Sequence, residues 1–321
     1  MEKKDLKIVF FGTPDFAVES LKRLVEGGYN VVGVVTMPDK PAGRGHHLLQ
    51  SDVKKYAVEN GLHLMQPVKL KDEEFVNELR SLSADLFIVI AFRMLPEVVW
   101  AMPRLGTFNL HASLLPKYRG AAPINWAVMN GETETGVTTF FLKHEIDTGD
   151  VIQQKSLPIG RKDNVETIHD GLMMMGAGMV IETVDAIIAG TVKPIPQSEM
   201  LTAGEKPTPA PKIFKDTCRI DWNWCAEKVY NHVRGLSPYP AAWTEIVDAA
   251  GKVYAVKIFE TGEPEAPSAN LVPGTLTTDG KRLWVACADA KIEILSLQMA
   301  GKRRMPTADF LRGFNIEGCH C

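Results

Sequence analysis

Two polar residues interrupt an otherwise apolar stretch of the chain. Asn109 and His111 are separated by a single residue within residues 107–111, a run that predicts a buried strand. Because side chains alternate along a strand, both project from the same face. A lone histidine there would more simply be a satisfied core residue, since burying an unpaired polar group costs on the order of several kcal/mol. The pair, followed by a loop with Gly120, instead favours a site at the end of a parallel strand.

A carboxylate that could partner the imidazole follows 36 residues after His111. Asp147 lies in residues 144–150 (HEIDTGD), between two predicted strands. Asp and Gly are ordinary turn residues, so this run is a weak signal by itself. Beside the strand of Asn109 and His111, however, it would complete a His–carboxylate arrangement suited to moving protons.

A third polar run comes at the first predicted strand-to-helix turn. Residues 12–16 (GTPDF) lack the G-x-G-x-x-G spacing, which excludes the dinucleotide-binding fingerprint. A tight turn capped by Thr or Asp explains this run as well as a ligand contact does.

The elements that must position these side chains alternate between strands and helices. Apolar runs predict buried strands at residues 7–12, 30–36, 86–91, 107–111 and 135–141, and helices at residues 17–26, 51–60 and 165–189. Residues 37–50, rich in Pro, Gly and His, predict an irregular loop. Strands without a polar face are typical of a mostly parallel, Rossmann-like α/β sheet with helices on both faces.

The length of 321 residues predicts more than one domain. We expect the α/β domain to occupy residues 1–190. Residues 191–216 contain five prolines among Lys and Thr, which predicts a semi-rigid linker. Residues 217–321 predict a short helix at residues 223–234. They also predict about five short strands, at residues 243–247, 253–259, 274–277, 283–286 and 292–298. Such a series favours a small OB-like β-barrel.

Composition narrows the class of protein. The net charge is −3 and neither domain is strongly basic, so a nucleic-acid partner would have to be held by local patches. No apolar run approaches the roughly 18 residues that span a bilayer, and we expect no signal peptide and a cytoplasmic location. The five cysteines fit no disulfide framework. Residues 319–321 (CHC) lack a second ligand pair, which predicts a disordered tail and no metal site.

Longer runs around these residues resemble a known family. Residues 111–124 (HASLLPKYRGAAPI) resemble the signature of 10-formyltetrahydrofolate-dependent formyltransferases, and residues 147–150 (DTGD) are similar to its second signature. Within that group, four further runs resemble the methionyl-tRNA formyltransferases: residues 11–16 (FGTPDF), 38–45 (PDKPAGRG), 219–222 (RIDW) and 296–302 (SLQMAGK). The resemblance covers nearly the whole chain, the C-terminal barrel included.

The resemblance implies a reaction and its catalytic residues. The co-substrate 10-formyltetrahydrofolate would give its formyl group to the free amine of initiator methionyl-tRNA, with Asn109, His111 and Asp147 as the catalytic trio. An α-amino group has a pKa near about 8, so a useful fraction is neutral at pH 7 and needs little activation. Asn109 and His111 could donate to the tetrahedral oxyanion, His111 could shuttle a proton, and Asp147 could orient His111.

The resemblance also implies two binding regions. The folate pocket would use the main chain of the loop after residue 91, at Arg93, Met94 and Leu95. A second wall would be formed by Ser113, Leu114, Leu115 and Pro116. Many methionyl-tRNA enzymes carry Tyr-Gly where this chain has Phe92-Arg93, a change that main-chain recognition tolerates. The tRNA contacts would be Arg44 in the loop of residues 37–50, and the run Lys302, Arg303 and Arg304 in the barrel. Taken alone, that basic run is more simply a solvated turn.

Several alternatives remain open at this point. The chain could be another folate formyltransferase, acting on a purine intermediate or an amino sugar, although the Arg44 loop and the barrel argue against the purine enzyme. A formyltetrahydrofolate hydrolase would use the same trio, but its additional domains are not evident. A catalytically silent RNA-binding module would not need Asn109, His111 and Asp147 together. We expect an enzyme that acts as a monomer without a membrane partner.

Overall fold

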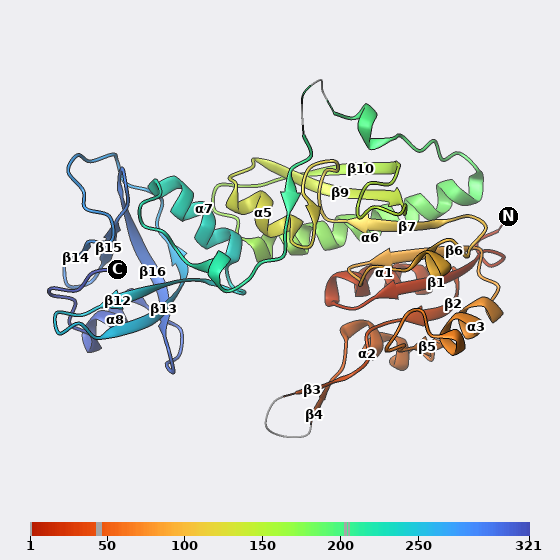
Figure 1. Ribbon diagram of the computed structural model, residues 1–321, viewed down its shortest axis with the longest axis horizontal. Coiled ribbons are helices and arrows are strands. Elements are labelled where there is room, and N and C mark those ends of the chain that lie inside the picture. The colour runs from red at the N-terminus through yellow and green to blue at the C-terminus, as the bar shows by residue number, and fades with distance from the viewer. Residues whose placement is uncertain (1, 43–46, 202–203, 205) are drawn as a thin grey trace. The chain divides into compact units, whose positions relative to one another are not determined.

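The computed structural model describes residues 2–42, 47–201, 204 and 206–321. Figure 1 shows the chain coloured by residue number from red to blue. It divides into two compact units, each made of three separate segments of the sequence. The first unit comprises Met1–Gly120, Thr135–Leu157 and His169–Pro209, and the second comprises Ala121–Glu134, Pro158–Ile168 and Ala210–Cys321. The ends of these units do not coincide with the predicted boundaries at residues 190 and 217.

A seven-stranded sheet forms the centre of the first unit, in the order β10-β9-β7-β6-β1-β2-β5. Its strands are β1 (Lys7–Gly12), β2 (Asn30–Val35), β5 (Leu64–Met65), β6 (Leu86–Ile90), β7 (Thr107–His111), β9 (Glu134–Phe141) and β10 (Val151–Pro158). The pairs β1/β2, β1/β6, β2/β5 and β6/β7 are parallel, whereas β9 runs antiparallel to β7. The predicted mostly parallel, Rossmann-like sheet is confirmed.

Helices cover both faces of this sheet. They are α1 (Asp15–Glu26), α2 (Asp52–Glu59), α3 (Glu73–Ser81), α4 (Glu97–Trp100) and α6 (Val165–Ala189). Apolar side chains of β1 and β6 pack against α3 and α4: Val9, Phe11, Phe87 and Val89 against Phe75, Val76, Leu79 and Val99. On the opposite face, α6 approaches β7 so closely that a Cβ on Gly176 would lie 2.7 Å from the Leu110 side chain. Helices α3 and α4 were not predicted from the sequence, and β10 corresponds to the strand that was predicted after residue 150 without bounds.

Helix α6 is the one described helix whose length and composition would allow it to cross a membrane. Soluble proteins contain core helices with the same properties, so this observation is weak evidence. Leu172, Ala177, Met179 and Val184 of α6 are fully buried in the protein. We therefore interpret α6 as a core helix.

The loop predicted at residues 37–50 is partly regular. Strands β3 (Lys40–Ala42) and β4 (His47–Leu49) pair as an antiparallel hairpin. Asp39, directly before β3, ties the base of the hairpin to the rest of the unit. It accepts a hydrogen bond from Lys54 of α2 at 2.5 Å and another from Gln66 at 2.9 Å. Arg44, the predicted tRNA contact, lies outside the described residues.

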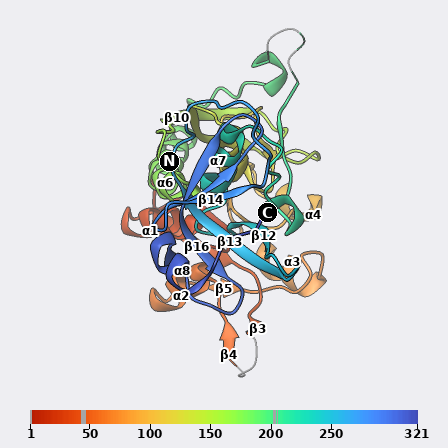
Figure 2. The same ribbon diagram turned by 90° about the vertical axis from the view of Figure 1, so that its left-hand side faces the viewer.

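Figure 2 shows the second unit, which is built on an antiparallel sheet. The order of its strands is β12-β13-β16-β15-β14, with β17 paired to β16. Its strands are β12 (Ala242–Val247), β13 (Val253–Thr261), β14 (Leu276–Thr278), β15 (Leu283–Ala286), β16 (Lys291–Met299) and β17 (Met305–Pro306), and its helices are α5 (Pro123–Met129), α7 (Ala226–Leu236) and α8 (Thr307–Gly313). The sheet curls into a half-barrel, which bears out the predicted fold class.

The predicted disordered tail is wrong. His320 forms backbone bridges with Val247 at the end of β12 and with Thr275 beside β14, and the Cys321 N–H donates to the Gly274 carbonyl at 2.9 Å. Cys319 is buried. The tail thus supplies backbone partners to two strands that are not paired with each other, which is why it is ordered despite its polar composition.

The proline-rich segment after α6 also contains regular structure. It includes two 3₁₀ turns, η1 (Gln197–Glu199) and η2 (Asp216–Cys218), and one short strand, β11 (Pro209–Ala210), which pairs with β8 (Arg119–Gly120). Ile195 exchanges two backbone hydrogen bonds with Val151 of β10, at 2.8 and 2.9 Å. This part of the predicted linker therefore packs on the first unit instead of merely spanning a gap.

Candidate active site

Strand β7 presents its polar residues on one face, as predicted. Asn109 lies beside Val89 of β6 and Phe140 of β9 in the sheet register, and His111 lies beside Thr138. Leu110 points to α6 on the other face. Asn109 is half-buried, and its side-chain amide makes no hydrogen bond within the described part of the chain. An amide held on a rigid strand is thus left available for a ligand.

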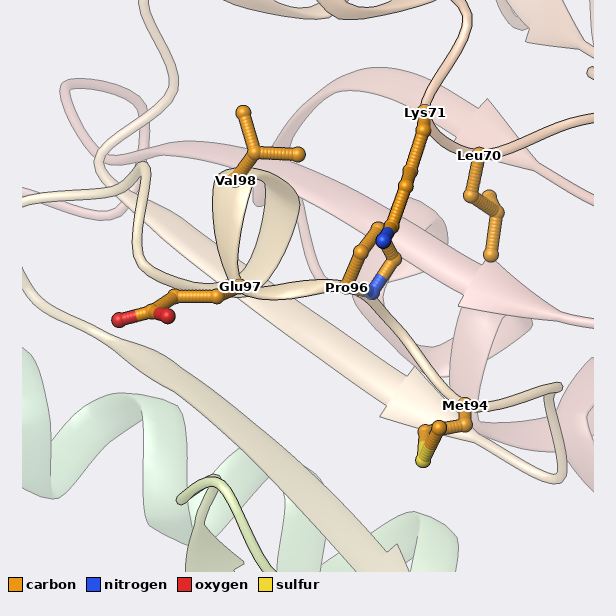
Figure 3. Close-up of a pocket in the computed structure, with 6 residues that line it drawn as sticks. All are labelled: Leu70, Lys71, Met94, Pro96, Glu97 and Val98. Atoms are coloured by element: carbon orange, nitrogen blue, oxygen red, sulfur yellow. The ribbon is translucent and has the colours of Figure 1, made fainter.

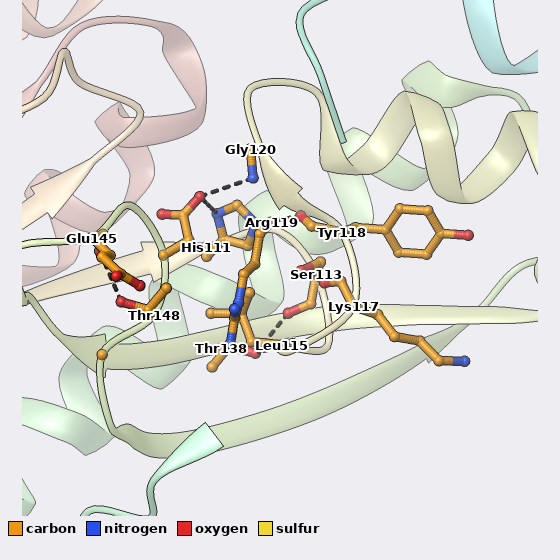
Figure 4. A network of polar contacts seen from close by, with 12 residues as sticks. His111, Ser113, Leu115, Lys117, Tyr118, Arg119, Gly120, Thr138, Glu145 and Thr148 are labelled. Atoms are coloured by element: carbon orange, nitrogen blue, oxygen red, sulfur yellow. Dashed lines mark hydrogen bonds and ion pairs between the residues drawn. The ribbon is translucent and has the colours of Figure 1, made fainter. Parts of the chain in front are cut away.

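His111 is held in one orientation by the loop that follows β7 (Figure 4). The residue is 7% exposed, and its Nε2 lies 2.8 Å from the Tyr118 carbonyl oxygen. A carbonyl only accepts hydrogen bonds, so Nε2 carries the hydrogen. In the neutral ring, Nδ1 is then the unprotonated nitrogen, and it lies 3.9 Å from Asp147 Oδ2. This geometry makes Nδ1 the nitrogen that can take up a proton, with a carboxylate beside it.

Asp147 sits in a tight turn that its neighbours hold. Its φ of 55° lies in the left-handed region that non-glycine residues adopt infrequently. Its Oδ2 accepts the Gly120 N–H at 2.9 Å, which joins the two loops that carry the family-like motifs. Gly149 packs so tightly that a Cβ there would lie 1.6 Å from the Phe141 carbonyl oxygen, so only glycine fits. The structure therefore brings the predicted Asp147 to the predicted His111.

The loop of residues 113–116, a predicted folate wall, is a rigid scaffold. Thr138 Oγ1 donates to the Ser113 carbonyl at 2.6 Å and accepts the Leu115 N–H at 3.1 Å. Gln154 Nε2 donates to the Leu115 carbonyl at 2.6 Å. The side chains of Ser113, Leu115 and Pro116 are buried, and Leu114 is half-buried. Their role as a wall of the folate pocket stays a prediction.

The loop after β6 carries the other predicted folate residues. Ala91 turns the chain with a φ of 46°, and Leu95 is buried. The Arg93 guanidinium is engaged: it donates to the Pro67 carbonyl and, at 2.8 Å, to the Val68 carbonyl. Burial lowers the pKa of Arg93. Its side chain therefore braces two loops against each other.

Met94 instead opens onto a pocket (Figure 3). The pocket has a volume of about 570 Å³ and is lined by Leu70, Lys71, Met94, Pro96, Glu97 and Val98. This volume is in the range of small-molecule sites, about 300–1,000 Å³. Because β6 and β7 are parallel neighbours, the loop carrying Met94 leaves the sheet at the same edge as His111. Sequence reasoning named Met94 but missed Leu70 and Lys71, which come from a different loop.

The predicted tRNA contacts of the barrel lie in the turn after β16. Lys302 and Arg303 are exposed. Arg304 is exposed as well, but it donates to Ser296 Oγ at 2.8 Å and lies over the Phe259 ring at 4.5 Å. Two of the three predicted cations are thus free to meet a partner, whereas Arg304 also has a packing role.

Two family models match the chain. Residues 6–184 match the model described as formyl transferase, and residues 212–315 match the one described as formyl transferase, C-terminal domain. A methionyl-tRNA formyltransferase of Bacteroides fragilis is 65% identical over 317 residues, which cover 98% of this chain and 97% of that protein. The chain belongs to the methionyl-tRNA formyltransferase family. A relative of the same name from Bacteroides thetaiotaomicron is 64% identical over 98% of both proteins.

More distant solved structures share the fold. The sugar 3N-formyltransferase WlaRD, crystallised in the presence of dTDP and 5-N-formyl-THF, matches with a TM-score of 0.64 at 19% identity, over 93% of this chain and 99% of that one. HypX from Aquifex aeolicus in complex with tetrahydrofolic acid matches with a TM-score of 0.60 at 21% identity. That match covers 95% of this chain but 46% of HypX, so this chain spans about half of that protein. At such identities the likeness shows the fold alone.

Proposed function

We propose that this enzyme transfers the formyl group of 10-formyltetrahydrofolate to the amino group of methionyl-tRNA, giving N-formylmethionyl-tRNA for translation initiation. The observation that carries the proposal is the buried His111, whose Nδ1 faces Asp147 at 3.9 Å at the carboxyl end of β7. The family assignment supplies the kind of donor and acceptor, and this pair, with Asn109 on the same strand, supplies groups suited to acyl transfer.

The reaction exchanges one N–C bond for another. The neutral amine of the methionyl ester attacks the formyl carbon, and a tetrahedral intermediate forms with the charge on the former formyl oxygen. The Asn109 amide donates a hydrogen bond to that oxygen. The amine loses a proton to His111 Nδ1, the resulting imidazolium is stabilised by Asp147, and the proton passes to the folate nitrogen as its bond to the formyl carbon breaks. Tetrahydrofolate leaves with the proton, and His111 returns to its neutral state.

The pocket beside Met94 is the proposed place of the formyl donor. Its Met94 and Pro96 belong to the loop that leaves the sheet at the same edge as His111. The loop of residues 113–116, held rigid by Thr138, is the proposed second wall of the donor site. Its Lys71 carries the positive charge that an anionic folate tail would require. No metal takes part in this proposal, and the described residues include no group of three or more His, Cys, Asp or Glu that could hold one.

Two separate groups of cations are the proposed contacts of the tRNA. Arg44 would read the acceptor end of the tRNA, while Lys302 and Arg303 would contact phosphates. With a net charge of −3, the protein has no overall positive field to attract tRNA, so these local cations have to provide the attraction. Since charged tRNA is a cytoplasmic molecule, we place the reaction in the cytoplasm, and we propose that a monomer carries it out.

One assay tests the proposal directly. The purified protein is incubated with formyltetrahydrofolate and initiator tRNA charged with radiolabelled methionine, and formylmethionine is measured after mild alkaline release. Free methionine and a nucleotide-linked amino sugar serve as alternative acceptors. We expect formylation of methionyl-tRNA only. Formylation of the amino sugar with none of the tRNA, or release of formate without any acceptor, would replace the proposal with a sugar formyltransferase or a hydrolase.

A further inference from the structure

One buried side chain links the two loops of the site without belonging to either. Gln197 lies in η1, in the segment that the sequence predicts as a linker, and is 2% exposed. We propose that Gln197 is a positioning residue that clamps the turn of Asp147 to the loop of Arg119, and so sets the place of the Asp147 carboxylate beside His111. This inference rests on the proposed function for its kinetic consequences, but not for its structural ones.

The hydrogen bonds of Gln197 use its entire amide. Its Nε2 donates to the carbonyl oxygens of Asp147 and Gly149, at 2.9 and 2.8 Å. Its Oε1 accepts from Nε and Nη2 of Arg119, at 3.0 and 2.7 Å. The orientation of the amide is fixed by its partners, because a guanidinium only donates and a carbonyl only accepts. Neither a carboxylate nor an apolar side chain of the same size can make this set of bonds.

The clamp acts where the backbone needs support. Asp147 has a φ of 55°, a conformation that the surrounding structure must hold in place. Gln197 binds the carbonyls on both sides of Thr148, and thereby fixes the turn from within. On the other side it fixes Arg119, whose neighbour Gly120 donates its N–H to Asp147 Oδ2 at 2.9 Å. The carboxylate is therefore located by two loops that share Gln197 as their common partner.

The clamp is itself anchored to the sheet. Two residues before Gln197, Ile195 exchanges backbone hydrogen bonds with Val151 of β10. Three residues after it, Met200 packs against the buried cluster of Leu115, Phe140 and Val151. A glutamine held on both sides in this way can transmit the rigidity of the sheet to the turn of Asp147.

Hydrogen exchange tests the structural part without any substrate. In Gln197→Met the Gly120 N–H should be separated from its partner Asp147 for much of the time, so that it exchanges at least about tenfold faster, whereas amides within β1 and β6 keep their protection. Gln197→Glu has the same shape and retains the acceptor for Arg119, but has neither donor. It should give the same result, and it replaces Gln197→Met in the test if that variant does not fold. Unchanged exchange at Gly120 in a folded variant overturns the clamp.

Steady-state kinetics test the effect of the Gln197 clamp on catalysis. Because Gln197 touches neither substrate in this proposal, Gln197→Met should lower kcat by up to about 10²-fold, the scale of an ångström-sized displacement, with little change of KM for either substrate. In an Asp147→Ala background the same substitution should have little further effect on kcat. Losses that simply multiply in the double variant would show that Gln197 does not act through Asp147.

The matched control is Gln153→Met. Gln153 is a half-buried glutamine on β10, and its side chain makes no hydrogen bond within the part of the chain that is described. It should retain wild-type exchange at Gly120 and wild-type kcat. If the wild-type protein forms no formylmethionyl-tRNA, the proposed function fails, while exchange at Gly120 still decides whether the clamp exists.

Discussion

At the scale of single residues, the site depends on which atom of each side chain is already engaged. His111 donates from Nε2 to the Tyr118 carbonyl, which leaves Nδ1 for proton transfer near Asp147. Asn109 keeps its amide free within the described structure. Arg93 does the opposite, because its guanidinium is occupied by two backbone carbonyls. Residue type alone does not separate these cases.

The first prediction concerns the proton-handling pair. His111→Ala and Asp147→Ala should each lower the rate of formylation by at least about 10², the lower range for a positioned acid–base group. Single-turnover rates with methionyl-tRNA measure the effect, and thermal melting checks that each variant is folded. His63→Ala, at an exposed histidine, is the control and should retain its activity. Activity close to wild type in either variant would remove that residue from the mechanism.

A second prediction concerns His232 in the second unit. Burial lowers the pKa of His232 from 6.5 to about 4, and its Nε2 has no hydrogen-bond partner in the described structure. The unfolded chain therefore binds a proton more readily than the folded one between pH 6.5 and 4. It follows that the contribution of His232 to stability is complete above pH 6.5 and is lost as the pH falls towards 4, by up to about 3 kcal/mol.

Denaturant unfolding at several pH values tests this sign. Fluorescence of Trp224 can report it, because its ring lies 5.1 Å from that of His232. Relative to wild type, His232→Gln should reduce the loss of stability between pH 6.5 and 4. Equal pH dependence in wild type and His232→Gln would show that His232 does not cause it.

At the scale of elements, the active site is a meeting of turns at one edge of a rigid sheet. The turn after β7 presents the Tyr118 carbonyl to His111, and the turn after β9 presents Asp147. Each turn contains a side-chain-bearing residue with positive φ, so each depends on tertiary contacts to persist. The regular strands determine direction, and the contacts between turns determine the final distances.

The third prediction tests the tightest of these contacts. Gly149→Ala would place a Cβ 1.6 Å from the Phe141 carbonyl oxygen, so the turn of Asp147 must move away from β9. We expect a loss of stability of about 1–3 kcal/mol, typical of overpacking, and a loss of kcat of about 10² or more. Gly178→Ala in α6 is the control, because its Cβ would meet only the end of Arg23. A Gly149→Ala variant with wild-type stability and rate would contradict this packing.

The fourth prediction concerns the hairpin of β3 and β4. Arg44 lies between Gly43 and Gly45 in the sequence, without an apolar neighbour to pack it, so its use is expected in a complex. Arg44→Ala and Arg44→Lys should both weaken tRNA formylation by about 1–3 kcal/mol if the guanidinium meets a base edge. The measurement is kcat/KM for tRNA beside the affinity for formylfolate, which should not change. Rescue by lysine would indicate a phosphate contact instead.

At the scale of the whole molecule, the protein must attract a polyanion although its own net charge is −3. Binding therefore depends on where cations are exposed, not on their total. Many arginines and lysines are already paired, for example Arg161 with Glu227 and Lys155 with Glu182. Lys302 and Arg303 have no ion pair in the described structure. They are the better candidates for phosphate contacts.

The fifth prediction follows from this distribution. The double variant Lys302→Ala and Arg303→Ala should lower kcat/KM for tRNA and flatten its dependence on salt, by about one unit of slope for each phosphate that is no longer neutralised. Formylfolate affinity should be unchanged. Lys55→Ala, which removes an exposed lysine paired with Asp52, is the control for a general charge effect. An unchanged salt slope would mean that the basic turn after β16 is only a solvated surface.

The sequence by itself determined the strands and the face of the central site. Runs such as residues 7–12 and 107–111 appear with the predicted bounds, because a buried parallel strand is apolar over its whole length and little else has that pattern. The spacing of Asn109 and His111 sufficed to put them on one face, since alternation is a property of the backbone. The order of the curled sheet and the pairing of its strands could not be obtained in this way.

Features that depend on contacts between distant parts of the sequence were decided only by the tertiary structure. No sequence pattern around Gln197 indicates its role, because it looks like any other residue of a proline-rich linker. What distinguishes it is four hydrogen bonds to residues that are distant in the sequence. The tail at His320 is ordered because Val247 of β12 and Thr275 beside β14 both offer it backbone partners. The pKa of His232 is lowered because the fold buries it. Local patterns determine elements, whereas burial and hydrogen-bond satisfaction depend on what the folded chain brings together.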